Sequence, residues 1–586
     1  MLDFEHARKK SFDEICQVNS AFILNLSEKK ELGFSKFVEA WSIKAEIFMP
    51  DNSIKVVDLY VCFPDDFPLV LPRIYLSEHD KEWIGYIPHV DVARYICTFD
   101  EEGITLDSSL PGKIVKSTLA KATGIIEDGL AKKNSADFED EFIAYWNEQY
   151  TKKDEILAGI TMLDPNSMPS SNSVKFLNLK TPYVGYSVIL HDESTDFLRF
   201  KSVLVEKGHA FDELEGFYLG QLASFQPPFD ITNEGLHSLV QQHFPALMPL
   251  FKRFINQPSY PKVLLFSIVV KQKTLIFGWR IFRLETARKG FRPTALSAMD
   301  VLNSFQKNDA VQRLKFDAFT KTRLQLRTDG HLEKDQPLKI AIAGLGSVGS
   351  NLLHYILPLN INKLVLIDPD ILTIENINRH LLGMDFVGTY KVDSIKKSLE
   401  SNNPLLEIKG IKKSIVRLMI NDMDMLNQCD YIFVAIGKTN IEEYLINALK
   451  ENALQKPVFI LWVEPYLCGA HCLLVQPGNC INLDDLYTDG LFNYNIISET
   501  EYKDTARQLN FREAGCQSSY LPYGQKKLTL FLASLIPEIY NIIERKERRN
   551  LRIMWKGNEQ QQKELNLKLS KLGEEMAFGA LTINEL

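Results

Sequence analysis

A strand of buried character that runs into a glycine-rich turn constrains the fold of this chain more than any other feature. The run from Lys339 reads KIAIAGLGSVG, with glycines at Gly344, Gly346 and Gly349, and Asp368 ends a second apolar run 19 residues after the last of them. Such glycines let backbone N–H groups approach a phosphate at a helix N-terminus, and an acid at the end of the next strand suits ribose hydroxyls. The sequence therefore predicts an α/β, Rossmann-like domain with a nucleotide site.

Charged and amide residues follow Asp368 closely, and they indicate which nucleotide is bound. Asp370, Asn376, Arg379 and Lys391 all lie within the next 23 residues. A dinucleotide pyrophosphate needs little cationic neutralisation, so NAD accounts poorly for this set. A triphosphate attacked at its α-phosphorus develops charge on the departing pyrophosphate, which preorganised cations stabilise. We therefore expect ATP; the plainer alternative is that Arg379 and Lys391 are solvated helix charges.

The composition argues against several other classes of function. The 586 residues are 45% hydrophobic and 24% charged, which is typical of a globular chain of roughly three or four domains. The net charge of −8 and the dispersed lysines give no basic footprint, so we expect no nucleic-acid partner. The sequence has no N-terminal signal segment and no apolar run long enough to cross a bilayer, so we expect no membrane association and a cytoplasmic location.

The eight cysteines are scattered, which fits reduced thiols in a reducing compartment. Cys468, Cys472 and Cys480 lie close together, but they form no C-x-x-C pair, and Cys472 is in an apolar run, HCLLV. We therefore favour buried structural thiols over a zinc site and assign no metal-ligating residue.

Apolar periodicity and polar linkers divide the chain into three segments. Residues 1–155 have an α+β order, a polar linker lies at 163–173, residues 174–305 form a mixed α/β segment, and 306–586 hold the nucleotide domain. The sequence of the middle segment indicates no particular chemistry. We expect strands at 40–49, 54–63, 263–270 and 274–282, and helices at 7–18, 113–131, 138–152, 234–256, 309–325 and, as a solvated tail, 544–571.

Cys516 is a candidate nucleophile because of the loop that contains it. The run from Arg512 to Gly524 is polar and carries glycine, serine and proline. A thiol in such a loop, near Arg512 and ahead of a helix, is placed for its thiolate to be favoured and to reach an adenylated carboxylate. The alternative is an incidental loop cysteine.

Cys97 is the second candidate nucleophile. The run FPDDFPLVLPRIYL begins at Phe63, a turn follows at His89, and Cys97 comes eight residues after that histidine. This pattern resembles the core of ubiquitin-conjugating enzymes. Those enzymes read His-Pro-Asn at the turn, whereas the third position here is Asp91, whose carboxylate repels an oxyanion, so stabilisation is left to His89 or to backbone N–H groups. The alternative for Cys97 is a small buried hydrophobe that ends a strand.

The nucleotide segment resembles the ThiF/MoeB and ubiquitin-activating-enzyme superfamily. The resemblance is carried by GLGSVGSNLLHYILPLNINKLVLIDPD from Gly344, then Asn376, Arg379, the GTYK run ending at Lys391, and Asn403-Pro404. It implies that the glycine loop holds ATP phosphates and that Asp368, the first acid of the pair completed by Asp370, binds ribose. It implies phosphate contacts for Asn376, Arg379 and Lys391. It also places a thioester cysteine in a loop after the sheet, which favours Cys516 as the nucleophile.

One position departs from that superfamily. Its members usually place a magnesium-binding Asp after the next core strand, whereas YIFVAI from Tyr431 leads here to Gly437 and Lys438. The resemblance implies ATP and Mg²⁺ as cofactors, but no residue of this sequence is assigned as the metal ligand. It also implies a homodimer in which an arginine from the neighbouring subunit, here Arg323 or Arg327, completes the ATP site.

A conjugating-like domain in front of an activating-like domain resembles the activating–conjugating fusion proteins of bacterial CBASS antiphage operons. That resemblance implies adenylation of a partner protein's C-terminal carboxylate, the partner being the operon's cyclic-oligonucleotide synthase (CD-NTase). Capture on Cys516, transfer to Cys97 and conjugation to a target amine would follow. One alternative is a ThiF/MoeB-like sulfur-carrier adenylyltransferase with a non-catalytic N-terminal module and a structural Cys97. Another is a non-catalytic scaffold that keeps ATP as a structural ligand.

Overall fold

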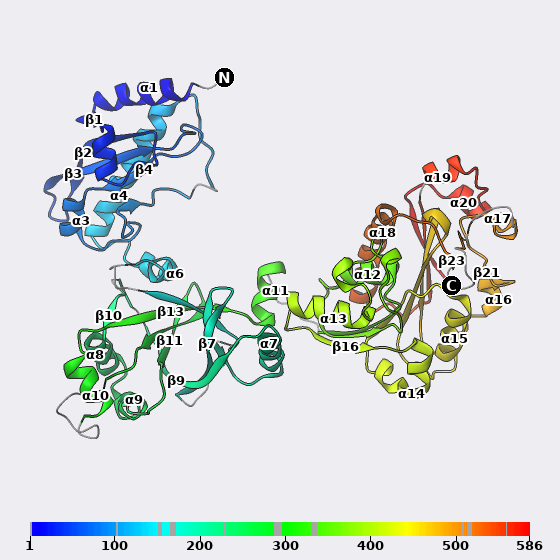
Figure 1. The fold of residues 1–586 in the computed structure, drawn as a ribbon. Coiled ribbons are helices and arrows are strands. Elements are labelled where there is room, and N and C mark those ends of the chain that lie inside the picture. Colours follow the sequence, from blue (N-terminus) through cyan, green and yellow to red (C-terminus); the bar gives the residue numbers. More distant parts are fainter. Residues whose placement is uncertain are drawn as a thin grey trace. The chain divides into compact units, whose positions relative to one another are not determined.

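The chain divides into two units, and helix α7 makes this division discontinuous in sequence (Figure 1). One unit comprises Met1–Glu193 and Gly208–Arg323, and the other comprises Ser194–Lys207 and Leu324–Leu586. Helix α7 (Thr195–Glu206) thus belongs to the second unit, although strands of the first unit precede and follow it. This computed structural model describes residues 3–100, 103–149, 155–164, 172–223, 225–227, 229–285, 296–329, 337–504, 509, 511–512, 519–557 and 559–586.

The N-terminal domain is a five-stranded sheet, ordered β1-β2-β3-β4-β5, and helices α1 and α4 pack against one of its faces. Alternate strand residues such as Trp41 and Leu59 are fully buried in the core that the sheet shares with α1 and α4. The strands predicted at 40–49 and 54–63 are confirmed as β2 and β3. The elements are α1 (Phe4–Cys16), β1 (Ala21–Ile23), α2 (Leu26–Glu31), β2 (Glu39–Phe48), β3 (Ile54–Phe63), β4 (Arg73–Leu76), α3 (Glu78–Ile84), β5 (Tyr95–Ile96) and α4 (Pro111–Leu130).

The middle domain is an eight-stranded sheet whose strand β13 pairs with both β12 and β6, which closes the sheet into a barrel. Two short helices, α5 (Asp137–Asp140) and α6 (Phe142–Trp146), lead into it, and Phe142 and Trp146 lie in its aromatic core. The strands are β6 (Ile156–Thr161), β7 (Ser173–Tyr183), β8 (Tyr186–His191), β9 (Phe211–Gln221), β10 (Ile231–Thr232), β11 (Lys262–Val270), β12 (Lys273–Ile281) and β13 (Ala310–Ala318). The predicted strand pair β11 and β12 is confirmed.

Three helix predictions in this region are wrong in part. The helix expected at 138–152 is the two short helices α5 and α6, which end at Trp146. The single helix expected at 234–256 is two helices, α8 (Asn233–His243) and α9 (Met248–Ile255), because Pro245 lacks an N–H and interrupts the helical hydrogen bonds. The helix expected at 309–325 is strand β13 followed by α11 (Lys321–Asp329). Pairing of β13 with distant strands outweighs its local helical pattern.

The second unit is built on an eight-stranded sheet in the order β16-β15-β14-β17-β18-β19-β24-β25. In β14, Ile340 and Ile342 face the core with α12, α13 and α18, while Ala341 and Ala343 face the core with α14 and α15. The main elements are β14 (Leu338–Ala343), α12 (Ser347–Ile356), β15 (Ile361–Ile367), α13 (Lys391–Asn402), β16 (Glu407–Ile411), α14 (Ile415–Asn427), β17 (Tyr431–Val434), α15 (Thr439–Lys450), β18 (Val458–Val463), β19 (Gly469–Val475), α18 (Gln525–Glu544), β24 (Leu551–Lys556) and β25 (Leu581–Glu585).

The solvated helix predicted at 544–571 is wrong. Between its charged flanks lies a short, mostly apolar run, Leu551–Lys556, which forms strand β24 between β19 and β25. Ile553 and Trp555 are almost fully buried in the core on the α12 face of the sheet. In the part of the chain that the structure describes, no helix combines the length and hydrophobicity needed to span a bilayer.

Candidate active site

The predicted nucleotide residues lie where the strand order of the second unit changes direction. Strand β14 lies between β15 and β17 and runs parallel to both. The loops after these three strands therefore leave the same edge of the sheet, and the connections to β15 and β17 diverge from this point. In open α/β sheets this is where ligands bind.

Two of the three glycines are required by the close packing of the turn after β14. Gly344 has φ +85°, and a Cβ atom there would lie 2.6 Å from the carbonyl oxygen of Ala435. A Cβ on Gly349 would lie 1.9 Å from the Gly344 oxygen. By contrast, a Cβ on Gly346 would meet nothing within 4 Å. The turn thus has open space beside Gly346, at the N-terminus of the ten-residue helix α12, which fits a phosphate group.

The side chain of Asp368 holds the glycine turn through hydrogen bonds to backbone N–H groups. Only 4% of this residue is exposed, and its Oδ2 atom accepts a 2.6 Å hydrogen bond from the Leu345 N–H. Its Oδ1 atom accepts a 2.8 Å bond from the Asp370 N–H. Burial raises the pKa of the Asp368 carboxyl, while Lys391 and the two backbone donors oppose that shift. Asp368 therefore holds the ends of β14 and β15 together, and each oxygen retains a further lone pair for a ribose hydroxyl.

Lys391 lies next to the acidic pair Asp368 and Asp370, because the loop between them and Lys391 closes on itself. The N–H of Lys391 donates to the Asp370 carbonyl at 3.0 Å, and its Nζ atom lies 3.1 Å from the Asp370 carboxylate. Lys391 is 7% exposed, whereas the Asp370 side chain is 66% exposed. A buried ammonium group therefore lies beside the buried Asp368, with an exposed carboxylate as its partner.

Arg379 is anchored to the glycine turn through its backbone. Its carbonyl accepts hydrogen bonds from Ser347 Oγ at 2.8 Å and from Asn351 Nδ2 at 3.0 Å, both on α12. Its guanidinium donates to the Leu521 carbonyl at 3.4 Å and lies over the Tyr523 ring. The half-buried Arg379 therefore lies between the glycine turn and the segment that precedes α18.

Asn376 has a local structural contact. Its Oδ1 atom accepts from the N–H and the hydroxyl of Thr373, which caps a short 3₁₀ helix, and its carbonyl accepts the N–H of Arg379. The structure brings Asp368, Asp370 and Lys391 into one cluster, whereas Asn376 and Arg379 are positioned by the loop between β15 and α13.

His380 is a member of the site that the sequence reasoning missed. Its Nδ1 accepts from the Leu382 N–H at 3.0 Å, so Nε2 carries the proton and donates to the Leu345 carbonyl at 2.8 Å. Burial lowers the pKa of His380, which keeps this tautomer neutral. His380 thus binds the Arg379 segment to the glycine turn. In the sequence, only its position directly after Arg379 pointed to a place in the site.

The end of β17 does not fit a magnesium ligand of the expected type. Gly437 has φ +66° and Lys438 caps α15, so no carboxylate occupies the two positions after this strand's apolar run. The nearby exposed acid, Asp370, is engaged by Lys391. The described residues directly after β17 therefore supply no carboxylate ligand for Mg²⁺.

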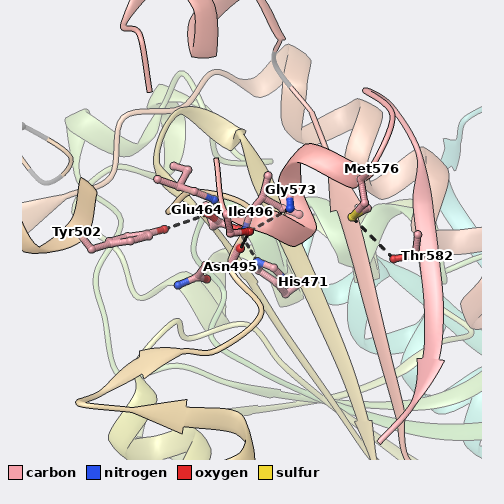
Figure 2. A network of polar contacts seen from close by, with 10 residues as sticks. Glu464, His471, Asn495, Ile496, Tyr502, Gly573, Met576 and Thr582 are labelled. Carbon is pink, nitrogen blue, oxygen red and sulfur yellow. Dashed lines mark hydrogen bonds and ion pairs between the residues drawn. The ribbon is translucent and has the colours of Figure 1, made fainter. Parts of the chain in front are cut away.

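Cys516 lies in the run 513–518, outside the described residues. An earlier segment, residues 496–502, is held by Glu464, which is 2% exposed. Its Oε1 accepts from the Ile496 N–H at 2.6 Å and from His471 Nε2 at 2.7 Å, and its Oε2 accepts from the Ile497 N–H at 2.8 Å and from the Tyr502 hydroxyl at 3.1 Å (Figure 2). We refer to these contacts as the Glu464 cluster.

The turn after Glu464 also contacts the chain after the Cys516 run. The N–H of Tyr466 donates to the Pro522 carbonyl at 2.7 Å. Burial, reinforced by Glu464, raises the pKa of Cys468 to about 12. Burial also raises the pKa of Cys472, above any physiological pH. Cys468 and Cys472 are therefore protonated core thiols, as predicted, whereas Cys480 is exposed, so the prediction of a buried thiol is wrong there.

Cys97 is exposed at the end of strand β5. Its N–H donates to the His89 carbonyl at 2.8 Å, so these two residues lie opposite each other in a hairpin. Asp91 accepts the Tyr95 N–H on Oδ1 at 2.7 Å and thereby closes the hairpin turn. The carboxylate expected to repel an oxyanion thus has a structural contact within the turn, and His89 is the residue across from Cys97.

Comparison with known families assigns both ends of the chain. The model described as prokaryotic E2 family B matches residues 36–154, and that of the ThiF family matches residues 320–465. The chain thus joins a prokaryotic E2-type domain to a ThiF-type domain. The fold is a mixed α/β fold with a Rossmann-like ThiF domain and an E2-like N-terminal domain, as predicted.

Three curated relatives match part of this chain. Adenylyltransferase and sulfurtransferase UBA4 of Lodderomyces elongisporus is 24% identical over 183 residues, 29% of this chain and 40% of the relative. UBA4 of Scheffersomyces stipitis is 33% identical over 20% of this chain and 27% of its own length. The tRNA threonylcarbamoyladenosine dehydratase of Haemophilus influenzae is 30% identical over 22% of this chain and 50% of its own length. The match therefore spans half or less of each relative.

Solved structures that match part of this chain include MccB and PaaA. E. coli MccB with ATP has 18% sequence identity and a TM-score of 0.28, over 40% of this chain and 62% of MccB. PaaA has 17% identity and a TM-score of 0.29, over 37% of this chain and 69% of PaaA.

Proposed function

We propose that this chain activates a C-terminal carboxylate of a partner protein with ATP, captures it as a thioester on Cys516, passes it to Cys97 and conjugates it to a target amine. The partner is proposed to be the CD-NTase of a bacterial antiphage (CBASS) operon. The observation that carries the proposal is the presence in one chain of a ThiF-type glycine turn with its buried acid and lysine, and an E2-type hairpin that exposes a cysteine.

In the first step an oxygen of the partner's carboxylate attacks the α-phosphorus of ATP, and pyrophosphate leaves with the electron pair of the broken P–O bond. Backbone N–H groups at the Gly344–Gly349 turn and the cations Lys391 and Arg379 are placed to stabilise that departing charge. Asp368 is proposed to bind the ribose, with Asp370 orienting Lys391, and Asn376 to contact phosphate. The product is an acyl-adenylate.

In the second step the Cys516 thiolate attacks the acyl carbon, a C–S bond forms and AMP leaves. The Cys97 thiolate then attacks this thioester, so that one C–S bond forms while the other breaks and Cys516 departs as thiolate. Finally the nitrogen of a target amine attacks the Cys97 thioester, a C–N bond forms, Cys97 leaves as thiolate and the amine loses a proton to water. Backbone N–H groups are the proposed stabilisers of the oxyanion, and His89, whose carbonyl accepts the Cys97 N–H, is proposed to hold the hairpin that presents the thiol.

We further propose a homodimer, with an arginine of the partner subunit completing the ATP site. Arg323 and Arg327 both lie on α11, with Arg327 exposed. The second candidate function is that of a sulfur-carrier adenylyltransferase, in which the E2-type domain only binds. The similarity of part of this chain to UBA4 favours it.

The first test is exchange of labelled pyrophosphate into ATP, measured with and without the proposed CD-NTase. The proposal expects exchange that depends on the intact C-terminus of that protein and disappears when its last residues are removed. Binding of NAD with no pyrophosphate exchange would overturn the activating function. Exchange without any thioester on Cys97 would support the sulfur-carrier alternative.

A further inference from the structure

The hairpin that presents Cys97 is held through His89. The His89 carbonyl accepts the Cys97 N–H at 2.8 Å, and the N–H of Asp91 donates to the Tyr95 carbonyl at 3.0 Å. His89 itself has φ +64°, a left-handed conformation that non-glycine residues adopt at some cost. A contact that fixes His89 therefore also fixes the backbone of Cys97.

Three side chains of helices α5 and α6 fix His89. Asp137 Oδ2 lies 2.9 Å from Nε2 of the His89 ring, and Glu141 Oε2 lies 3.5 Å from Nδ1. The His89 N–H donates to the Tyr145 hydroxyl at 2.7 Å, and that hydroxyl donates to Glu141 Oε2 at 3.1 Å. Both ring nitrogens and the backbone N–H of His89 thus face one strip of side chains, spaced four residues apart along the segment.

The opposite side of the same segment belongs to the barrel. Phe142 and Trp146 are fully buried in the aromatic core that includes Phe277 of strand β12. The indole N–H of Trp146 donates to the Leu314 carbonyl at 3.1 Å, and the buried Arg313 guanidinium donates to the Trp146 carbonyl. The barrel therefore fixes the helices whose other side contacts His89.

Further charged groups surround the turn after His89. The Nζ atom of Lys81 donates to the Val90 carbonyl at 3.3 Å. Glu148, which follows α6, faces Asp91 and accepts a backbone hydrogen bond from Val92; burial and the charge of Asp91 raise the pKa of Glu148 to about 7. Residues 137–148 thus line the turn from His89 to Val92 along its length.

We propose that Asp137, Glu141 and Tyr145 are positioning residues that hold His89 and the Cys97 backbone for attack of the target amine on the Cys97 thioester. The barrel domain then supports the conjugating site by fixing helices α5 and α6, and does not only separate the E2-type and ThiF-type domains. This inference rests on the proposed role of Cys97 as the thiol that carries the acyl group.

The test compares D137A, D137N and Y145F with the wild type and with D140N, which changes an exposed carboxylate on the same helix α5. The first readout is hydrogen exchange of the Cys97 amide in the full-length chain, which requires neither ATP nor a partner. Exchange should accelerate by about tenfold in D137A and Y145F, because one lost hydrogen bond corresponds to about that factor. D137N keeps an acceptor for Nε2 and should recover part of the protection, while D140N should match the wild type.

The second readout separates loading of Cys97 from its discharge. Cys97 is loaded with ATP and the CD-NTase, and the thioester is then discharged with free lysine in a single turnover. Discharge should slow by about 10- to 100-fold in D137A and Y145F, since small misplacements of reacting groups cost that much, while loading stays within about twofold. A role in folding alone would lower loading and discharge together.

Wild-type discharge in D137A and Y145F, or unchanged exchange of the Cys97 amide, would overturn the inference. If the wild-type Cys97 never loads, the proposed function fails. The exchange measurement still decides whether the barrel-anchored helices hold the Cys97 hairpin.

Discussion

Replacement of Glu464 by Gln should loosen the segment that leads towards Cys516. The Glu464 carboxylate accepts four hydrogen bonds, two on each oxygen, from the Ile496 and Ile497 N–H groups, His471 and Tyr502 (Figure 2). A glutamine keeps one oxygen and places an NH₂ group at the other position, so two buried donors lose their acceptor. At about 1–3 kcal/mol for each unsatisfied donor, the expected loss is about 2–6 kcal/mol.

The assay is hydrogen exchange of the Ile496 and Ile497 amides, because a chain of several domains does not unfold in one step. E464Q should exchange faster at both amides, and Y502F, which removes one donor, should lose about 1 kcal/mol of protection. E499Q provides the matched control, because Glu499 is exposed and pairs with Lys503. Equal exchange in E464Q and E499Q would refute the role assigned to the Glu464 cluster.

Three further changes test other parts of the account. R379A should lower the rate of pyrophosphate exchange by about 100-fold, which is the effect of losing one charge-stabilising donor. R417A, on the exposed side of α14, should leave this rate unchanged. Equal rates in the two variants would contradict the role assigned to Arg379. G349A should lower the protection of the β14 amides against hydrogen exchange by about 1–3 kcal/mol, because its Cβ would lie 1.9 Å from the Gly344 oxygen. Wild-type protection of these amides would count against the close packing of the turn. Burial raises the pKa of Glu442 from 4.5 to about 7, so its contribution to stability is present below pH 4.5 and is lost as pH rises towards about 7. E442Q should remove this loss, worth about 3 kcal/mol at most, and an unchanged pH dependence of stability would contradict the raised pKa.

The nucleotide site was predictable from sequence because its parts are local. The glycine spacing after β14 and the distance to Asp368 follow from strand and turn lengths, and the turn and the acid meet as expected. His380 was missed because its role depends on the fold of the loop after β15, which returns it to the Leu345 carbonyl. The Glu464 cluster was missed because three of its four contacts join Glu464 to residues 32 to 38 positions away.

The elements that sequence periodicity misassigned share a physical cause. In β24, a run of six residues lies between charged flanks, so averaging over a longer window hides a strand that two neighbours pair with. In β13, Arg313 breaks the apolar pattern, yet its buried guanidinium donates to backbone carbonyls of residues 146 and 148. Strand pairing and ion burial both depend on residues distant in sequence, which local patterns do not report.

The sequential use of two cysteines is the central claim, and intact mass after incubation with ATP and the CD-NTase tests it most directly. The wild type should gain the mass of the partner minus water, in an adduct that dithiothreitol removes, because a thioester exchanges with thiols and an amide does not. C97A should keep this adduct on Cys516, and C516A should form acyl-adenylate but no thioester, while C16A, which changes another exposed cysteine of the N-terminal domain, should behave as the wild type. A C97A variant that conjugates the partner to a target amine at the wild-type rate would contradict the account and leave the E2-type domain as a binding module.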